Sequence, residues 1–213
     1  MPRMPNADDR DRMRRRLALA AYDVIAEIGY DSVTLERVAR RAAVSKGLLL
    51  YYFASKDQLL AAAMDHLVIL IRRRIQQAIS HTEDPIERLD AYLDAITWDA
   101  EEHRKFYRVY LDFLGRGLHQ ARLQESTQAF VQGCETFERD IVLHGLAGGM
   151  FHIPGDPREA VQTVRTMIDG MSIRWALDDT DSFSAFRTRL RVAIYRYLGA
   201  DPQSAAGAAP VGG

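Results

Sequence analysis

Residues 29–60 read GYDSVTLERVARRAAVSKGLLLYYFASKDQLL, and this stretch decides the fold. Apolar residues recur at helical spacing twice within it, over residues 34–42 and again over residues 45–52. Thr34 and Ser45 are placed to cap these two short helices. Helices this short are unstable alone, and a connection of about three residues makes them cross steeply. The pattern is typical of a helix-turn-helix, whose second helix enters the major groove of DNA.

The second short helix has an unusual surface. Leu49 and Phe53 are spaced to face inward and anchor it, which leaves six residues near the surface: Lys46, Gly47, Leu48, Leu50, Tyr51 and Tyr52. Such a surface is too apolar to face water without a reason. On DNA, leucines can contact thymine methyl groups, tyrosine hydroxyls can reach phosphates or base edges, and glycine lets the backbone come close.

Helical spacing continues on both sides of this stretch. Leu17, Ala21, Val24, Ile25 and Ile28 form one stripe that ends at Gly29, and Ser55 with Gln58 opens a long helix. Asp84-Pro85 and Asp156-Pro157 mark two further helix starts. Other helices are predicted near residues 102–116, 120–145, 157–177 and 182–198, with a loop over residues 145–155. No period-2 strand is evident, so the sequence predicts an all-α fold of about nine helices.

Composition divides the chain into two unlike parts. The net charge is −1 over 213 residues, but residues 1–60 hold eleven Lys and Arg against eight Asp and Glu, a net charge of +3. The remainder carries −4, which suits a phosphate-contacting module on an acidic body. Within the basic part, Arg12, Arg14, Arg15 and Arg16 could grip phosphates as an arm or form a solvated helix start.

Residues 29–60 resemble the DNA-binding region of the TetR family of transcriptional regulators. The resemblance covers roughly residues 10–60, and the matching positions are Gly29, Thr34, Val38-Ala39, Val44-Ser45, Gly47, Leu49, Tyr52-Phe53 and Lys56. It implies that Thr34, Tyr52 and Lys56 meet phosphates and that residues 45–51 lie in or beside the major groove. Ala43 stands where most members have glycine, and Leu48 and Leu50 stand where Thr and Tyr are common. The operator sequence therefore cannot be transferred from a relative.

The rest of the chain resembles the BetI-like members of that family, through TMIDGMSIRWALDDT at residues 166–180. This implies a helical effector-binding and dimerisation domain over residues 61–199. It would follow a DNA-binding domain at residues 1–60, which includes a short flexible arm, and residues 200–213 would form a disordered tail. Five residues at heptad-like spacing predict the dimer interface: Phe183, Phe186, Leu190, Ile194 and Tyr197.

A small-molecule pocket is expected between the middle helices, where aromatic side chains gather. Its candidate residues are Trp98, Phe106, Tyr110, Phe113, Phe130, Cys134, Phe137, Met171 and Trp175. For any single one of them, an ordinary place in the core is at least as good an interpretation, and the expectation is only that some subset, with Met171 or Trp175, faces a cavity. Cys134 is either a redox sensor or inert packing.

The motifs of an enzyme are missing from the sequence. None of the six histidines completes a His-Glu-x-x-His or Glu-x-x-His pattern, and no Gly-x-Ser-x-Gly or phosphate loop is present. Asp140 and His144 could bind a metal or form a surface pair. Cys134 is the only cysteine, which excludes an internal disulfide, and no apolar segment suggests a membrane span or a signal peptide.

We therefore expect a cytoplasmic, homodimeric, DNA-binding regulator without a cofactor. By the family resemblance it is a repressor, released by a small-molecule effector from an inverted-repeat operator, although activation stays open. The alternative is a helical small-molecule-binding protein or enzyme without DNA function.

Overall fold

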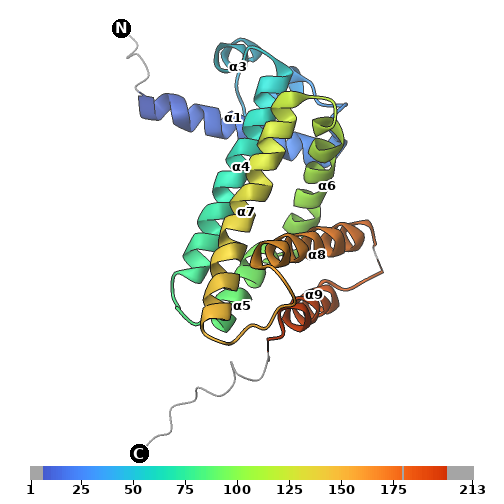
Figure 1. Cartoon of the computed structure of the whole chain (residues 1–213). Coiled ribbons are helices and arrows are strands. Elements are labelled where there is room, and N and C mark those ends of the chain that lie inside the picture. The colour runs from blue at the N-terminus through green and yellow to red at the C-terminus, as the bar shows by residue number, and fades with distance from the viewer. Residues whose placement is uncertain (1–6, 179, 201–213) are drawn as a thin grey trace, which may run out of the picture. The chain divides into compact units, whose positions relative to one another are not determined.

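The computed structural model describes residues 7–178 and 180–200, and this part of the chain forms nine α-helices and no strand (Figure 1). The helices are α1 (Ala7–Ile28), α2 (Leu35–Arg41), α3 (Lys46–Tyr52), α4 (Lys56–Ile79), α5 (Pro85–Ile96), α6 (Ala100–Gly117), α7 (Ala121–Ala147), α8 (Pro157–Leu177) and α9 (Phe183–Leu198). The predicted all-α fold is confirmed. Residues 1–6, where the expected arm would lie, and residues 201–213, most of the expected tail, lie outside the described residues.

The chain divides into two compact units. Unit 1 contains Met1–Leu70 and Lys105–Phe130, and unit 2 contains Ile71–Arg104 and Val131–Gly213. The boundaries fall inside α4, α6 and α7, so unit 1 extends past residue 60 and includes parts of these helices besides α1, α2 and α3. Unit 2 contains α5, α8 and α9 together with the remaining parts.

The predicted helix caps are confirmed by their hydrogen bonds. Thr34 Oγ1 accepts from the backbone N–H of Arg37 at the start of α2, and Ser45 Oγ accepts from that of Leu48 at the start of α3. At the start of α4, Ser55 Oγ accepts from the N–H of Gln58, and Gln58 Oε1 accepts from the N–H of Ala54, one residue earlier than in a capping box. Asp84 and Asp156 cap α5 and α8 in the same way, each followed by proline. These caps satisfy N–H groups that the helices leave without intrahelical partners.

The turn between α2 and α3 contains Ala43, one of the three residues that depart from the pattern of the resembling family. Ala43 has φ of 50°, the left-handed conformation in which a Cβ is strained, and the N–H of Val44 returns to the carbonyl of Ala39 (2.9 Å). The short turn that brings α3 against α2 therefore requires a positive φ at this position.

Ala43→Gly is expected to stabilise unit 1 by about 1 kcal/mol, because glycine adopts this conformation without the Cβ clash. Urea denaturation of the two proteins measures the difference. A variant less stable than the wild type would show that the turn does not hold the left-handed conformation in solution.

In unit 1, α2 and α3 are held by a few fully buried side chains. Val38 of α2, Leu49 of α3 and Phe53 after it are buried, as are Leu17 and Ile25 of α1. The inward positions predicted for Leu49 and Phe53 are confirmed. Since α3 has only seven residues, its orientation depends on these tertiary contacts.

In unit 2, α8 and α9 run side by side (Figure 1). The loop expected to begin at Gly145 begins after Ala147, because Gly145 remains helical and its lack of a side chain makes room for the buried ring of Phe151. A Cβ at Gly145 would lie 2.1 Å from that ring. The chain then turns at Gly149, where φ is 69°.

Candidate DNA-binding surface and small-molecule cavity

The exposed side of α3 is apolar, as the sequence predicts. Leu48, Leu50 and Tyr51 are exposed by 37%, 41% and 63%, whereas Leu49 between them is fully buried. Gly47 and Lys46 are also exposed, and Tyr52 is half-buried. The ring of Tyr52 meets that of Tyr51 edge-on, with centroids 5.2 Å apart. The capped helix therefore presents two leucines and a tyrosine on its exposed surface.

Lys46, at the first position of α3, forms an ion pair with Glu36 in the first turn of α2. The Lys46 ammonium lowers the pKa of the Glu36 carboxyl through their hydrogen bond. Both side chains are about half exposed, so the pair lies on the surface. The ammonium group has three N–H donors, so this pair leaves Lys46 able to donate to a further acceptor.

The three residues expected to meet phosphates are placed in unit 1 around α3. Thr34 is exposed and its hydroxyl caps α2, while the half-buried Lys56 begins α4. The Lys56 ammonium lies 3.3 Å from the carbonyl oxygen of Asp31 and 5.3 Å from the centre of the Tyr30 ring. It can still add its charge to the positive end of α4.

A basic groove between α1 and α2 was not anticipated from the sequence. It is lined by Val24, Glu27, Ile28, Arg37, Arg40 and Arg41. Arg41 is paired with Glu27 and Asp23, whereas Arg37 and Arg40 are exposed. The run ERVARR at residues 36–41 carries the signal, since positions i, i+3 and i+4 share one side of a helix.

The arginine cluster of α1 fits neither of the two predicted roles completely. Arg12 pairs with Asp9 on the surface, as a solvated helix start would. Arg14 and Arg16 instead donate to backbone carbonyl oxygens, those of Tyr52 at the end of α3 and Ala42 after α2. Their guanidinium groups therefore contact the helix-turn-helix itself.

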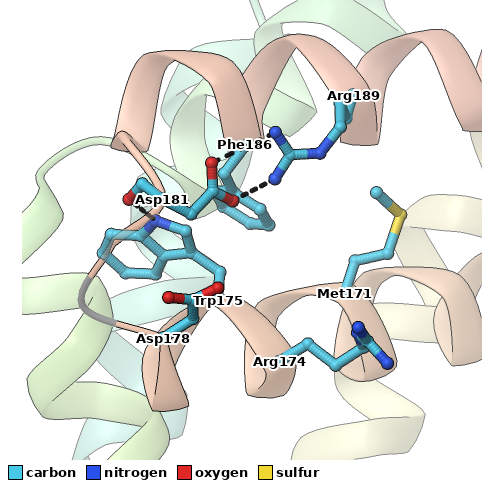
Figure 2. A pocket seen from close by; sticks show the side chains of 7 residues that line it. All are labelled: Met171, Arg174, Trp175, Asp178, Asp181, Phe186 and Arg189. Carbon is cyan, nitrogen blue, oxygen red and sulfur yellow. Dashed lines mark hydrogen bonds and ion pairs between the residues drawn. The ribbon is translucent and has the colours of Figure 1, made fainter.

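Unit 2 contains a cavity of about 200 Å³ between α8 and α9 (Figure 2). Its lining residues are Met171, Arg174, Trp175, Asp178, Asp181, Phe186 and Arg189. Figure 2 shows Arg189 directed at the carboxylate of Asp181, with which it forms an ion pair. The indole N–H of Trp175 donates to the backbone oxygen of Asp181 (3.0 Å).

Of the nine candidate residues for a small-molecule pocket, the two that line this cavity are Met171 and Trp175. Phe106, Tyr110 and Phe130 pack together in unit 1, with ring centroids 5.1–5.5 Å apart, and Phe113 meets Tyr30 edge-on. In unit 2, Trp98 lies beneath the guanidinium of Arg74, and Cys134 and Phe137 are buried on α7. The charged lining residues were not among the candidates; the acidic segment between α8 and α9 was a signal for Asp178 and Asp181, whereas Arg174 and Arg189 lie within the helices.

A buried polar cluster links α5, α7 and α8 within unit 2. Arg165 Nη1 lies 3.1 Å from Glu138 Oε1 and its Nη2 lies 2.9 Å from Asp169 Oδ1, and Tyr92 donates its hydroxyl proton to Glu138 (2.5 Å). Burial raises the pKa of Glu138, and the nearby Arg165 opposes that effect. Burial also raises the pKa of the Cys134 thiol to about 12, which favours inert packing because the thiolate is the reactive form.

The predicted dimer interface needs a correction. Phe186, Leu190 and Ile194 are fully buried within a single chain, because this stripe of α9 faces inward. Phe183 and Tyr197 are half-buried. Among the described residues of the α8–α9 region, the large apolar side chains that remain exposed are Leu177 and Val192. Heptad-like spacing identifies a packed stripe but does not say whether its partner belongs to the same chain.

Asp140 and His144 form a surface pair, with His144 Nδ1 3.2 Å from Asp140 Oδ1, and Arg88 also contacts Asp140. Within residues 7–178 and 180–200, no three His, Cys, Asp or Glu side chains gather as a metal site would require. Across the same residues, no helix has the length and apolarity needed to cross a membrane.

A capped short helix with an exposed reading surface, packed on a second short helix across a tight turn, defines a helix-turn-helix DNA-binding protein. Comparison with known proteins agrees with this class. Residues 18–63 match the model of bacterial regulatory proteins of the tetR family, and residues 85–199 match the model of the BetI-type transcriptional repressor C-terminal domain. The chain belongs to the TetR family and is a transcriptional regulator of that family, not an enzyme.

Similar proteins extend over nearly the whole chain. The HTH-type transcriptional regulator BetI of Stenotrophomonas maltophilia is 31% identical and covers 91% of this chain and 94% of its own length. A TetR transcription regulator from Haloarcula marismortui is 23% identical, covers 89% of this chain and 97% of its own, and superposes with a TM-score of 0.77. A regulator from Saccharomonospora viridis, solved in complex with choline, is 21% identical, covers 88% and 98%, and has a TM-score of 0.80.

Proposed function

We propose that the protein is a cytoplasmic, homodimeric repressor that binds an inverted-repeat operator through α3 and leaves it when a small molecule binds unit 2. The observation that carries the DNA-reading part is the exposed surface of Leu48, Leu50 and Tyr51 on a capped helix. Leucine side chains can discriminate bases by contact with thymine methyl groups, and a tyrosine hydroxyl can do so by hydrogen bonds to base edges. Of the other residues predicted to contact DNA, Thr34, Tyr52 and Lys56 would meet phosphates, and Ser45, Lys46 and Gly47 would lie in or beside the major groove.

The dimer is proposed to form through the outer face of the α8–α9 pair. Leu177 is 75% exposed, and Val192, Phe183 and Tyr197 add partly exposed apolar surface. A two-fold dimer presents two copies of α3 and therefore reads an inverted repeat. Half-site centres about 34 Å apart, one turn of DNA, would match two recognition helices on one face of the duplex.

Fluorescence anisotropy on duplex DNA from upstream of the protein's own gene tests this proposal. We expect binding at least ~10³-fold tighter than to a scrambled duplex, and an affinity that falls steeply with salt. A duplex with only one half of the inverted repeat is expected to bind much more weakly, since a dimer then gains only one specific contact surface.

Two leucine variants make the assay specific for α3. Leu50→Ala is expected to reduce the preference for the upstream DNA roughly tenfold, the scale of one lost base contact. Leu118→Ala is the matched control, because Leu118 is an 81% exposed leucine elsewhere in unit 1. Equal behaviour of both variants and the wild type would favour a helical protein without DNA function.

For the effector, we propose the cavity between α8 and α9 as the binding site and an organic cation as the ligand class. Arg189 is already paired with Asp181, so Asp178 and Arg174 carry the remaining charge of the lining. A cationic group placed against Asp178 would lie beside Trp175, whose ring already meets one cation, since the guanidinium carbon of Arg104 lies 4.4 Å from its centre. The choline complex of the Saccharomonospora viridis regulator makes choline the first compound to examine.

Choline added to the protein–DNA complex is expected to lower the anisotropy to that of free DNA. The physical requirement is that choline binds the DNA-incompetent state more tightly, since a ligand with equal affinity for both states shifts nothing. Trp98→Phe leaves Trp175 as the only tryptophan, so choline should change its fluorescence, and Asp178→Asn should abolish that change. An unchanged signal with choline would exclude it as the effector at this site.

A further inference from the structure

Two arginines on one side of α1 contact the end of the recognition helix. Arg14 Nη1 donates to the carbonyl oxygen of Tyr52 (2.9 Å), the last residue of α3, and its guanidinium carbon lies 4.5 Å from the centre of the Phe53 ring. Arg10, one turn earlier, donates from Nη2 to the hydroxyl of Tyr51 (2.9 Å). Spaced at i and i+4, the two side chains reach neighbouring positions of α3.

The carbonyl that Arg14 holds is one that the helix cannot satisfy itself. The last four C=O groups of a helix have no intrahelical partner and carry the negative end of its dipole. Arg16 makes the corresponding contact at the end of α2, where it donates to the carbonyl oxygen of Ala42, the residue that follows the helix. Both helices of the helix-turn-helix therefore end on a guanidinium group from α1.

This end of α3 has little else to hold it. Leu49 is the only buried residue of α3, and Phe53 directly follows the helix. Two anchors at i and i+4 permit rocking about the line that joins them, whereas a third contact fixes the angle. Arg14 supplies that contact on both the Tyr52 carbonyl and the Phe53 ring, and Arg10 restrains the highly exposed Tyr51.

We infer that Arg10 and Arg14 are positioning residues for DNA reading: they fix the C-terminal end of α3 and the Tyr51 hydroxyl, and they do not serve as phosphate contacts. This role differs from that of a basic arm, in which any positive charge suffices. The inference rests on the proposed reading of DNA by α3. The experiments below distinguish a failure of the inference from a failure of the proposed function.

Arg15 offers a matched control, because it is an exposed arginine adjacent to Arg14 and rotated from it by about 100° around α1. Hydrogen exchange on the DNA-free protein tests whether Arg14 holds the end of α3, and it needs no operator DNA. Arg14→Ala is expected to speed exchange of the Phe53 amide, which bonds to the carbonyl of Leu49 (3.0 Å), while Arg15→Ala leaves it unchanged. Equal exchange in both variants would overturn the inference.

A second experiment measures the binding of each variant to upstream and scrambled DNA duplexes over a series of salt concentrations. Arg14→Ala is expected to lower the preference for upstream DNA roughly tenfold with little change in the salt slope, and Arg14→Lys should not restore it. If Arg14 were a phosphate contact, Arg14→Ala would weaken both duplexes equally, the slope would fall by about 1, and lysine would restore binding. That result would overturn the inference.

The Arg10–Tyr51 bond provides a second variant set that leaves the buried anchors untouched. Arg10→Ala and Tyr51→Phe each remove the same hydrogen bond, so the double variant is expected to bind upstream DNA no more weakly than the worse single variant. Additive losses would mean that Arg10 acts independently of Tyr51, against the inference. A wild-type protein that does not discriminate between the two duplexes would refute the proposed function. The exchange experiment would still show whether Arg14 holds the end of α3.

Discussion

Arg165→Ala is expected to lower the free energy of unfolding by about 3–5 kcal/mol, because it leaves the carboxylate of Glu138 buried without its partner. Both side chains are almost completely inaccessible, and they lie 3.1 Å apart between α8 and α7. Tyr92 donates to the same carboxylate oxygen, so one hydrogen bond would survive the substitution. Urea denaturation at neutral pH measures the loss.

Two comparisons show whether the cost comes from the unpaired charge. The double variant Arg165→Met with Glu138→Leu removes both charges of the pair and is expected to recover part of the stability, since apolar replacements of buried ion pairs are often neutral but Asp169 and Tyr92 each lose a hydrogen bond here. Arg122→Ala breaks the exposed pair with Asp65 and should cost less than about 1 kcal/mol. A double variant as unstable as Arg165→Ala would mean that lost packing, and not charge, causes the effect.

The same variant has a predictable pH dependence. Burial already raises the pKa of Glu138 above its usual 4.5, and loss of Arg165 removes the main group that opposes this rise. A carboxyl with a raised folded-state pKa contributes most to stability below its unfolded pKa and loses that contribution as the pH rises. Arg165→Ala should therefore be closest to the wild type near pH 4.5 and fall furthest behind it above neutrality.

The second large effect is an acid-induced loss of about 3 kcal/mol that is assigned to His103. Burial lowers the pKa of this histidine from 6.5 to about 4, and its Nδ1 lies 3.0 Å from the carbonyl oxygen of Ile96. Its ring packs against those of Trp175, Phe183 and Phe186, with centroids 5.4–5.6 Å apart. Protonation would place a charge among these aromatic groups.

The sign follows from the direction of the shift. Because the folded-state pKa is depressed, the contribution of His103 to stability is complete above pH 6.5 and is lost as the pH falls toward 4. His103→Asn removes the titrating ring and keeps an amide donor near the position of Nδ1. The stability of this variant should change less between pH 7 and pH 4.5 than that of the wild type.

His81→Asn is the control for this experiment, since His81 is exposed beside the end of α4. It should follow the wild-type pH profile. An unchanged profile for His103→Asn would show that other groups account for the acid sensitivity of unit 2.

Local features of the chain were predictable because they depend on neighbours in the sequence. The caps at Thr34, Ser45 and Asp84 require only a hydroxyl or carboxylate placed two or three residues before an N–H group, and the structure contains each bond. The alternation of buried Leu49 with exposed Leu48 and Leu50 follows from helical geometry in the same way.

Features that depend on which distant group meets a side chain were not predictable. The stripe of Phe186, Leu190 and Ile194 was expected to face a second subunit, but it packs within its own chain. The nine aromatic, Met and Cys candidates for one pocket are distributed over two units and several packing clusters. A periodic apolar stripe predicts that those side chains are buried, but it does not identify the helix or subunit against which they pack.

The sequence by itself determined an all-α fold with a helix-turn-helix and the exposed side chains of α3, since helix periodicity, capping and turn chemistry act over a few residues. Only the tertiary structure decided the strain at Ala43, the pairing of Lys46 with Glu36, and the contacts of Arg10 and Arg14 with α3. A long guanidinium or ammonium side chain can reach many acceptors. Which one it meets depends on how helices distant in the sequence pack together.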